Sequence, residues 1–380
     1  MDFDYSDDQR QLRETLQRYL AKQYSFDRYR AIKASAEGWN REVWNELAEL
    51  GVLAVNVPTE QGGLGFGPLE TLALMDVCGP SMLLEPLTSS AVIATSLLSG
   101  FAADGAVAEL LQRLASGEKI AVLAHYESDA RSELQWVSTR AQRRGDTYTL
   151  NGHKAVVLHA SLADILLVSA RTSGENGDAD GVSLLRVPRD SAGLQVVRYA
   201  TVGGQLAAEI LMKDVQLPVT ARVSAEGKAL PAIELALDVG LAALCAESVG
   251  IMQALLSATV EYLRTRQQFG QAIGRFQALQ HRVADMVTHL EQARSMSFLA
   301  AMRCTSADLT ERRRALSAAK VVIGQSGRFI GQQAIQLHGG MGMTEELNVS
   351  HLFKRLTATE FMFGDTDTHL QKFAALTRNS

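Results

Sequence analysis

Two short stretches place polar donors and glycines at predicted helix ends. RTRQQFG at 264–270 supplies a cation, two amides, a phenyl ring and a glycine where a helical pattern breaks and restarts. QLHGGMG at 336–342 lies where a long helical pattern ends. Exposed N–H groups and bare backbone at helix ends suit phosphate binding, and an arginine adds a charge-assisted clamp. Each stretch alone is weak evidence, but the two together indicate a large anionic cofactor such as a dinucleotide.

Common catalytic and metal-binding motifs are absent from the sequence. There is no GxSxG, HExxH, GxxxxGK[ST] or strand-linked GxGxxG. The three cysteines form no CxxC and no metal spacing, so we expect reduced thiols and no metal site; they are Cys78, Cys245 and Cys304. Histidines on predicted helices or helix ends are expected to be structural; they are His281, His338 and His351.

Bulk composition excludes several classes of protein. The chain has 380 residues, a net charge of −5 and a pI near 5.9, which does not suggest a nucleic-acid partner. Its acidic start, MDFDYSDDQRQ, does not match a signal peptide, and no stretch is expected to match the roughly 18 apolar residues of a membrane span. We therefore expect a cytoplasmic protein without a membrane partner.

The type of secondary structure that the residue pattern indicates changes twice along the sequence, which predicts three domains. Helical patterns fill an N-terminal domain at 1–117, short strands rich in Val, Leu and Thr fill a middle domain at 118–225, and long helices fill a C-terminal domain at 226–380. The predicted fold class is mainly α with a central β-barrel or β-sandwich domain and a C-terminal four-helix bundle. The apolar helix at 231–267 is expected to be buried in the bundle or in a subunit interface.

Local signals predict where individual elements begin and turn. Ser6 and Gln9 form a capping box for a first helix, and Pro68 suits the first turn of a later one. The Asn151-Gly152 pair is a strong signal for the turn of a β-hairpin.

The whole chain resembles the acyl-CoA dehydrogenase family. The resemblance rests on an Arg-x-x-Phe-Gly stretch followed by Ile-Gly-x-Phe-Gln and Ala-Asp-Met, on a Gln-x-x-Gly-Gly-x-Gly stretch, and on a Pro-x-x-x-Gly-Gly-x-Gly loop at 58–65. The matching residues are Arg266, Phe269, Gly270, Ile273, Gly274, Phe276, Gln277, Ala284, Asp285, Met286, Gln336, Gly339, Gly340 and Gly342. QQAIQLHGGMGMT, HLFKRLT and FGDTDTHL are most similar to small subunits of heteromeric (α2β2) members, such as that of pimeloyl-CoA dehydrogenase.

The resemblance implies FAD as the cofactor and assigns residues to its adenosine diphosphate end. In the family this contact is made across a subunit interface, so the bundle is expected to oligomerise. The implied cofactor-binding residues are Arg266, Gln268, Phe269, Ile273, Phe276 and Gln277 on one subunit, with Gln336, Gly339 and Gly340 on the other subunit of the pair.

The sequence departs from the family where the catalytic base is expected. Family members remove the α-proton with a glutamate directly before a glycine of the last segment, and here Phe363 precedes Gly364. A minority place the glutamate on the buried bundle helix, where this chain has Gly240, followed by Leu241 in place of an arginine. Neither phenylalanine nor glycine accepts a proton, so the catalytic residue is unknown.

The segment expected beside the flavin ring departs as well. A family pattern of Thr-Glu-Pro-x-x-Gly-Ser-Asp aligns with Tyr126, Glu127, Ser128, Arg131, Ser132 and Glu133, and only Glu and Ser remain. The Trp-Ile-Thr that packs on the flavin ring in the family reads Val156, Val157, Leu158. The substitutions therefore fall on the flavin-ring side, whereas the adenosine-side motifs are kept.

Three other carboxylates lie near these two positions in the sequence. Glu247 follows Gly240 by two helical turns within an apolar run, so it is either a base with a raised pKa or a buried partner of an arginine between helices. Glu360 lies one turn before Phe363, and Asp365 is expected to cap the closing helix.

The resemblance implies one leading function and leaves two alternatives. The leading hypothesis is a subunit that lends part of an FAD site to a second acyl-CoA dehydrogenase-like chain, which supplies the glutamate, although a homotetramer remains possible. Its substrate would be a dicarboxylyl, branched or steroid side-chain CoA thioester, and its electrons would pass to an electron-transfer flavoprotein. The alternatives are a flavin monooxygenase or oxidase on the same fold and a purely structural subunit.

Overall fold

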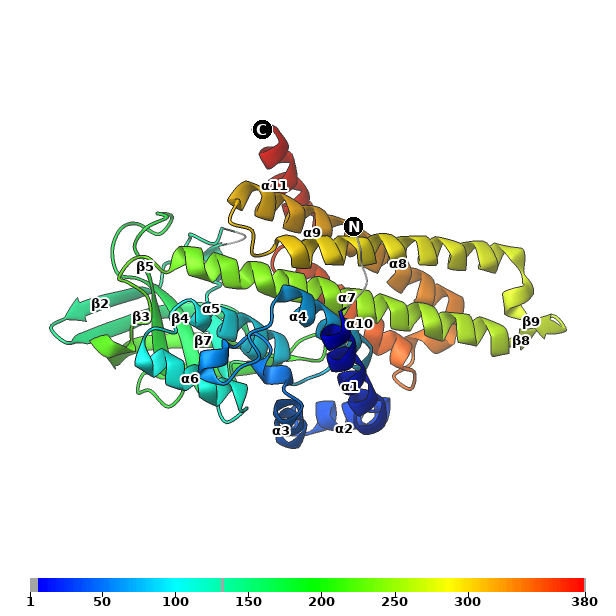
Figure 1. The fold of residues 1–380 in the computed structure, drawn as a ribbon. Coiled ribbons are helices and arrows are strands. Elements are labelled where there is room, and N and C mark those ends of the chain that lie inside the picture. The colour runs from blue at the N-terminus through cyan, green and yellow to red at the C-terminus, as the bar shows by residue number, and fades with distance from the viewer. Residues whose placement is uncertain (1–5, 131–132, 379–380) are drawn as a thin grey trace.

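The computed structural model describes residues 6–130 and 133–378, and it follows the order helices, sheet, helices (Figure 1). The helices before the sheet include a π-helix at Leu87–Ala94 and six α-helices: α1 (Asp7–Gln23), α2 (Phe26–Ala34), α3 (Arg41–Glu49), α4 (Pro68–Cys78), α5 (Thr95–Ser99) and α6 (Gly105–Ala115). The type of element changes between α6 and residue 121, where the sheet begins.

Local signals at helix starts behave as the sequence predicts. Ser6 accepts a hydrogen bond from the backbone N–H of Gln9, whose side chain bonds back to Ser6, so the capping box of α1 is confirmed. Pro68 occupies the first turn of α4, where its missing N–H has no intrahelical partner to lose.

A curled seven-stranded sheet forms the middle of the chain. Its strands are β1 (Ala121–Ala124), β2 (Arg140–Arg144), β3 (Thr147–Leu158), β4 (Ile165–Arg171), β5 (Val182–Pro188), β6 (Leu194–Ala200) and β7 (Leu206–Pro218). The order is β1-β4-β2-β3-β7-β6, with β5 paired to β4. β1 and β4 run parallel in direct register, whereas β3, β7 and β6 form the long antiparallel ladder. The fold class predicted from the sequence is confirmed.

The predicted turn at Asn151-Gly152 is wrong. β3 runs through both residues, and the hairpin turn lies between Arg144 and Thr147, which face each other at the ends of β2 and β3. A Cβ on Gly152 would lie 2.5 Å from the Thr139 hydroxyl oxygen, and the register shifts beside it. Gly152 therefore permits a close approach within the sheet rather than a turn.

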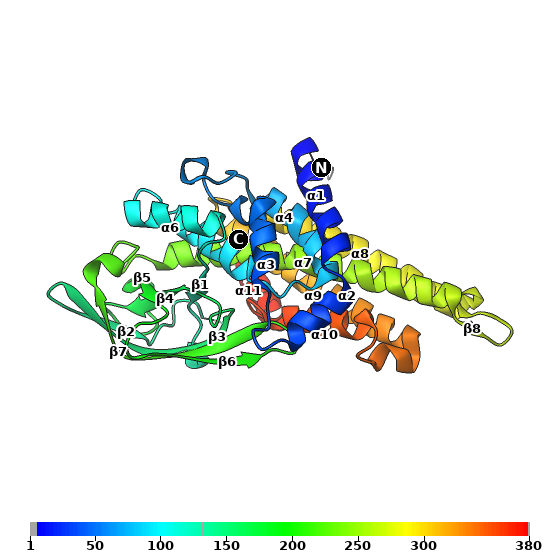
Figure 2. The same cartoon turned by 90° about the horizontal axis from the view of Figure 1, so that it is seen from below.

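Most of the described residues after the sheet belong to five α-helices: α7 (Leu230–Thr265), α8 (Gln277–Arg303), α9 (Leu309–His338), α10 (Asn348–Phe361) and α11 (Thr366–Arg378). Helix α7 lies between the others and against the N-terminal helices (Figures 1 and 2). Contrary to the expectation from sequence, α7 is long and apolar enough to cross a membrane, but 89% of its apolar window is buried inside the fold. That burial is typical of the core helix of a folded domain.

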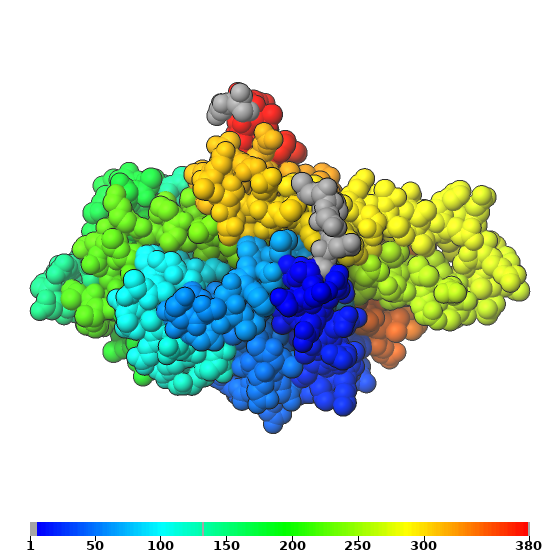
Figure 3. Space-filling view, in the orientation of Figure 1, coloured from blue at the N-terminus to red at the C-terminus, as the bar shows by residue number. Residues whose placement is uncertain are grey.

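The break at 264–270 is a small β-hairpin rather than a simple helix break. Strands β8 (Gln267–Gln268) and β9 (Gln271–Ala272) pair between α7 and α8, and the helix resumes only at Gln277. The hairpin protrudes at the end of the molecule opposite the sheet (Figure 1), which is the yellow end in the space-filling view (Figure 3).

Candidate functional site

A cavity of about 620 Å³ lies where the sheet meets the bundle. Its walls come from the ends of β1 and β3, the loop before β7, the π-helix, the first turns of α7, and the loop between α10 and α11. Most of the lining is apolar; the polar and ionisable lining residues are Thr88, Ser89, His125, Tyr126, Glu127, Ser128, His159, Thr201, Gln205, Asp238, Asp365, Thr368, His369 and Lys372.

The two positions where the family places its glutamate lie against each other at the wall of this cavity. A Cβ on Gly240 would lie 3.4 Å from the tip of the Phe363 ring and 2.7 Å from Ile93. Phe363 lines the cavity and has a φ of 60°, a left-handed conformation that costs energy for a bulky side chain. A phenyl ring thus lies against bare backbone, with no proton acceptor at either position.

His369 on α11 holds the loop that carries Phe363. Its Nε2–H donates to the Phe363 carbonyl oxygen at 3.0 Å, and Nδ1 accepts from the Ser317 hydroxyl at 3.2 Å. Burial lowers the pKa of His369 to about 4, so the ring is neutral near pH 7 and keeps this tautomer. The loop is therefore fixed at its carbonyl by a buried neutral imidazole.

Glu247 lies away from the cavity in a buried ion pair. Nε and Nη2 of Arg355 on α10 both donate to its Oε1, the first at 2.8 Å and the second at 2.5 Å, and each side chain is only 4% exposed. The alternative of a buried partner for an arginine between helices is therefore confirmed. Asp365 accepts from the Thr368 backbone N–H at 2.8 Å, which confirms that it caps α11.

Asp238 is a cavity carboxylate that sequence reasoning missed. It lies on α7 two residues before Gly240, and its Oδ2 is 2.8 Å from Nε of Arg312. Burial raises the pKa of Asp238 to about 6, and the guanidinium opposes that rise. The available signal was an acid within the apolar first half of α7, which also holds Glu234 and Glu247.

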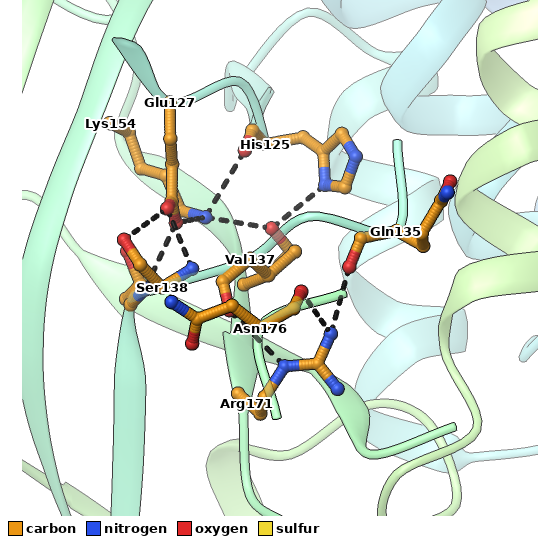
Figure 4. Close-up of polar contacts among 10 residues, drawn as sticks. His125, Glu127, Gln135, Val137, Ser138, Lys154, Arg171 and Asn176 are labelled. Atoms are coloured by element: carbon orange, nitrogen blue, oxygen red, sulfur yellow. Dashed lines mark hydrogen bonds and ion pairs between the residues drawn. The ribbon is translucent and has the colours of Figure 1, made fainter. Parts of the chain in front are cut away.

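The segment aligned with the flavin-side strand contains a buried polar cluster (Figure 4). Lys154 Nζ lies 2.7 Å from Oε1 of Glu127 and 3.0 Å from the Ser169 hydroxyl, and it also donates to the His125 carbonyl. Burial by itself would raise the pKa of Glu127, but the Lys154 ammonium and hydrogen bonds from Ser138 hold it below its usual range. Glu127 therefore anchors the cavity wall and is not a free base.

The three residues aligned with the family's Trp-Ile-Thr are aliphatic. Val156 has a φ of 53° and is 57% exposed, at the position where the family's tryptophan is aligned, while Val157 and Leu158 continue the cavity wall. Arg131 and Ser132 lie outside the described residues. At these three positions the cavity wall thus has no counterpart of the tryptophan that the resemblance would supply.

The residues expected at the adenosine end lie at the opposite end of the molecule, and none lines the cavity. On the hairpin, Ile273 N–H donates to the Arg266 carbonyl at 2.9 Å, Gln268 pairs with Gln271, and the rings of Phe269 and Phe276 meet edge to face at 5.9 Å. Phe269 is 88% exposed. Gln277 begins α8 directly after this group.

The second glycine-containing stretch comes to the same end of the bundle. Tyr262 in the last turn of α7 stacks on His338, the last residue of α9, with ring centroids 4.6 Å apart. Gly339 and Gly340 follow, and no atom lies within 4 Å of a Cβ added to either. Gln336, in the last turn of α9, accepts the Gly339 N–H. The structure therefore brings both sequence motifs to one end of the bundle as open backbone and exposed donors.

Comparisons with known proteins cover nearly the whole chain. Family models match residues 6–118 as an acyl-CoA dehydrogenase N-terminal domain, 123–215 as the middle domain and 229–376 as the C-terminal domain. An L-prolyl-[peptidyl-carrier protein] dehydrogenase of Pseudomonas fluorescens is 30% identical, with 97% of each chain covered.

Solved structures share the fold. One is described as a variant of the Tcur3481-Tcur3483 steroid ACAD; it has a TM-score of 0.87 and is 26% identical, with 98% of each chain covered. The ChsE4-ChsE5 complex from Mycobacterium tuberculosis has a TM-score of 0.89 at 22% identity, with 100% of each chain covered, which shows the fold alone.

Proposed function

Because the chain belongs to the acyl-CoA dehydrogenase family, we propose that it is one subunit of a heteromeric enzyme that introduces an α,β double bond into an acyl-CoA thioester. Members of this family are FAD-dependent oxidoreductases, and the chain is an FAD-dependent acyl-CoA dehydrogenase by that membership. The proposal adds the division of labour: this chain lends part of an FAD site, and a related partner chain supplies the catalytic glutamate.

The contact between Phe363 and Gly240 carries the proposal. Removal of the α-proton needs a base within hydrogen-bond reach, and neither family position holds one. Glu247 is bound to Arg355 outside the cavity, and Glu127 is bound to Lys154. The two aspartates that line the cavity are also engaged, because Asp238 pairs with Arg312 and Asp365 caps α11. A partner chain with its own glutamate supplies what this cavity lacks.

The chain's own residues fit FAD in two separate places. At the hairpin end, Arg266 and Gln268 are exposed and the backbone of Gly339 and Gly340 is open, which suits a diphosphate. The cavity suited to a ring system lies at the other end of the molecule. This separation supports a cofactor held between two chains, with the hairpin of this chain against a flavin seated in the partner. FAD, when bound, supplies the hydride acceptor.

The cavity and the relatives support a bulky or dicarboxylyl acyl group. Val156, Val157 and Leu158 stand where the family pattern aligns Trp-Ile-Thr, so this part of the cavity wall is aliphatic. The 26% identical structure is described as a steroid ACAD. A 26% identical relative in Acetobacterium woodii is a caffeyl-CoA reductase–Etf complex subunit, which supports an electron-transfer flavoprotein as the electron acceptor.

Flavin content of the chain alone and beside a co-expressed family member tests the division of labour. We expect the lone chain to be colourless and the pair to be yellow, with fewer flavins than subunits and turnover that depends on the partner's glutamate. A lone chain that is yellow, tetrameric and bleached by an acyl-CoA would refute the proposal.

A pair of variants separates cofactor loss from general damage. Arg266→Ala in the hairpin removes a guanidinium expected at the diphosphate, so the complex should lose flavin without losing its fold. Arg198→Ala on exposed strand β6 is the matched control, because it removes a guanidinium from the far end of the molecule. Equal flavin content in both variants would contradict a role for the hairpin.

A further inference from the structure

Two hydrogen-bonding side chains in the cavity wall have no partner in the fold. Thr88 on the π-helix and Gln205, just before β7, both line the cavity, and each residue is only 7% exposed. Across the residues that the structure describes, nothing pairs with the Thr88 hydroxyl or with the side-chain amide of Gln205, although the Gln205 backbone carbonyl accepts from Thr201. Buried polar groups are nearly always hydrogen-bonded, so these two need partners from inside the cavity.

His159 brings the two side chains to one part of the wall. The Ser89 hydroxyl oxygen lies 2.8 Å from His159 Nδ1, and the His159 backbone N–H donates to the Leu206 carbonyl at 2.8 Å. Thr88 and Gln205 are the sequence neighbours of Ser89 and Leu206, and Ser89 and His159 also line the cavity. We call these four lining residues the polar recess: Thr88, Ser89, His159 and Gln205.

The backbone that carries both unpaired side chains is held in place. The N–H and the hydroxyl of Thr201 both donate to the Gln205 carbonyl at 2.9 Å, which closes a tight loop through Gly204 at a φ of 91°. Thr88 lies in a π-helix, a rare geometry that occurs frequently at functional sites, and all eight residues of this helix are buried. The polar recess therefore presents its free donors and acceptors from fixed positions, which lowers the entropy cost of binding a ligand there.

The polar recess carries no charge of its own. Burial lowers the pKa of His159 to about 3, so its ring is neutral near pH 7, and the other three side chains do not ionise. Arg355 is the charged group that acts on His159, but it does not line the cavity and is paired with Glu247 at 2.8 Å. A carboxylate placed in the recess would lose its hydration without gaining a counter-ion, whereas a neutral group would avoid that cost.

We propose that Thr88 and Gln205 are specificity-determining residues that bind a hydroxyl group on the acyl chain of the thioester. A hydroxyl both donates and accepts hydrogen bonds, and so do the amide of Gln205 and the hydroxyl of Thr88. A ligand hydroxyl can replace the water that such groups bind in an open cavity, whereas a methyl group would leave them unpaired. The inference rests on the proposed function for the thioester class, and it specifies a neutral oxygen on the bulky acyl group.

Matched thioesters test this recognition. The probes are fatty acyl-CoA, ω-hydroxyacyl-CoA and α,ω-dicarboxylyl-CoA thioesters with hexanoyl, octanoyl and decanoyl chain lengths, so that probes of one length differ only at the terminal carbon. Calorimetric titration of the complete protein, in the assembly in which it purifies, gives a Kd for each probe. The variants are Gln205→Leu, Thr88→Val and the conservative Thr88→Ser, with Gln195→Leu on exposed strand β6 as the matched control.

The wild type should prefer a hydroxyl at the chain length that reaches the polar recess. There the hydroxyl probe should bind about tenfold more tightly than its fatty counterpart, and the dicarboxylyl probe should show no such gain. Gln205→Leu should remove most of this preference, Thr88→Val should reduce it about threefold, and Thr88→Ser should keep it. Gln195→Leu should match the wild type, because Gln195 does not line the cavity.

The melting temperature of the same variants separates recognition from a structural role. Because the Gln205 amide has no partner in the fold, Gln205→Leu should leave the melting temperature unchanged or raise it, even as it removes the preference for the hydroxyl probe. An amide that stabilised the fold through hydrogen bonds would instead lower the melting temperature when it is removed.

Any of three results overturns the inference. These are a wild-type protein in which no hydroxyl probe binds more tightly than its fatty counterpart, a preference that survives in both Gln205→Leu and Thr88→Val, and a Gln205→Leu protein that is destabilised. The proposed function fails separately: if the lone chain is yellow and active without a partner, the division of labour is wrong, while the pattern of Kd values still decides the role of the polar recess.

Discussion

The Glu247→Gln variant tests two statements about Glu247: that it stabilises the fold through Arg355, and that it is not the catalytic base. Arg355 donates two hydrogen bonds to a single oxygen of Glu247, and both side chains are 4% exposed. Glu247→Gln leaves a buried guanidinium without its counter-ion, which costs about 3–5 kcal/mol of unfolding free energy. Because Glu247 does not line the cavity, turnover per folded complex should stay within about twofold of the wild type, less than 0.5 kcal/mol in the barrier.

A double-mutant cycle isolates the pair. Arg355→Met alone leaves a buried carboxylate and Glu247→Gln alone leaves a buried guanidinium, whereas the two changes combined leave neither charge unpaired. The double variant should therefore be more stable than the sum of the single effects predicts by at least about 2 kcal/mol. Urea unfolding at fixed pH gives the free energies, and steady-state assays on refolded complex give turnover. A stable Glu247→Gln protein that has lost turnover by a hundredfold or more would refute this reasoning and make Glu247 the base.

Three further predictions concern packing, pH and the exposed hairpin. Gly250→Ala should destabilise the fold by about 1–3 kcal/mol, measured as a lower midpoint of unfolding, because its Cβ would lie 2.0 Å from the Asp76 carbonyl oxygen. Gly340→Ala is the control, because the space around its Cβ is open, and it should change stability by less than about 0.5 kcal/mol. Burial raises the pKa of Glu85 from 4.5 to about 7, so the folded state keeps the proton to higher pH than the unfolded state does, and stability falls as the pH rises from about 4.5 to 7. Glu85→Gln should remove this fall, which is worth about 3 kcal/mol when the free energy of unfolding is compared at pH 4 and pH 8. Equal pH profiles for the wild type and the variant would contradict this prediction. Phe269→Ala should leave the melting temperature of the chain unchanged, because the ring is 88% exposed, but should reduce the flavin bound per complex, measured by absorbance.

Helices and caps were predictable because their signals are local. The spacing of apolar residues and the Ser6–Gln9 box act within one or two turns, so α1 and α7 begin close to their expected residues. The Asn151-Gly152 prediction failed because the same two residue types also suit a different constraint. Gly152 is needed for the approach of Thr139, a contact between strands that no local pattern encodes.

The candidate site was predictable only where one stretch contains its parts. RTRQQFG and QLHGGMG each keep their residues together, although their meeting at one end of the bundle depends on the stacking of Tyr262 on His338. The cavity combines residues far apart in the chain. Asp238 comes from α7 and Lys372 from α11, which are more than 100 residues apart in the sequence, so neither the carboxylate nor the ammonium carried a recognisable motif.

The positions at which this sequence differs from the family pattern favour an FAD shared between two chains over a chain that no longer binds FAD. A chain that no longer bound FAD would have no reason to present exposed Phe269 beside Arg266, since an exposed phenyl ring at a protruding tip has no stabilising contact with its own core. A chain that completed its own active site would need a base where Phe363 meets Gly240. The two observations are compatible if the hairpin serves a flavin in another chain and the cavity keeps a binding role without the proton transfer.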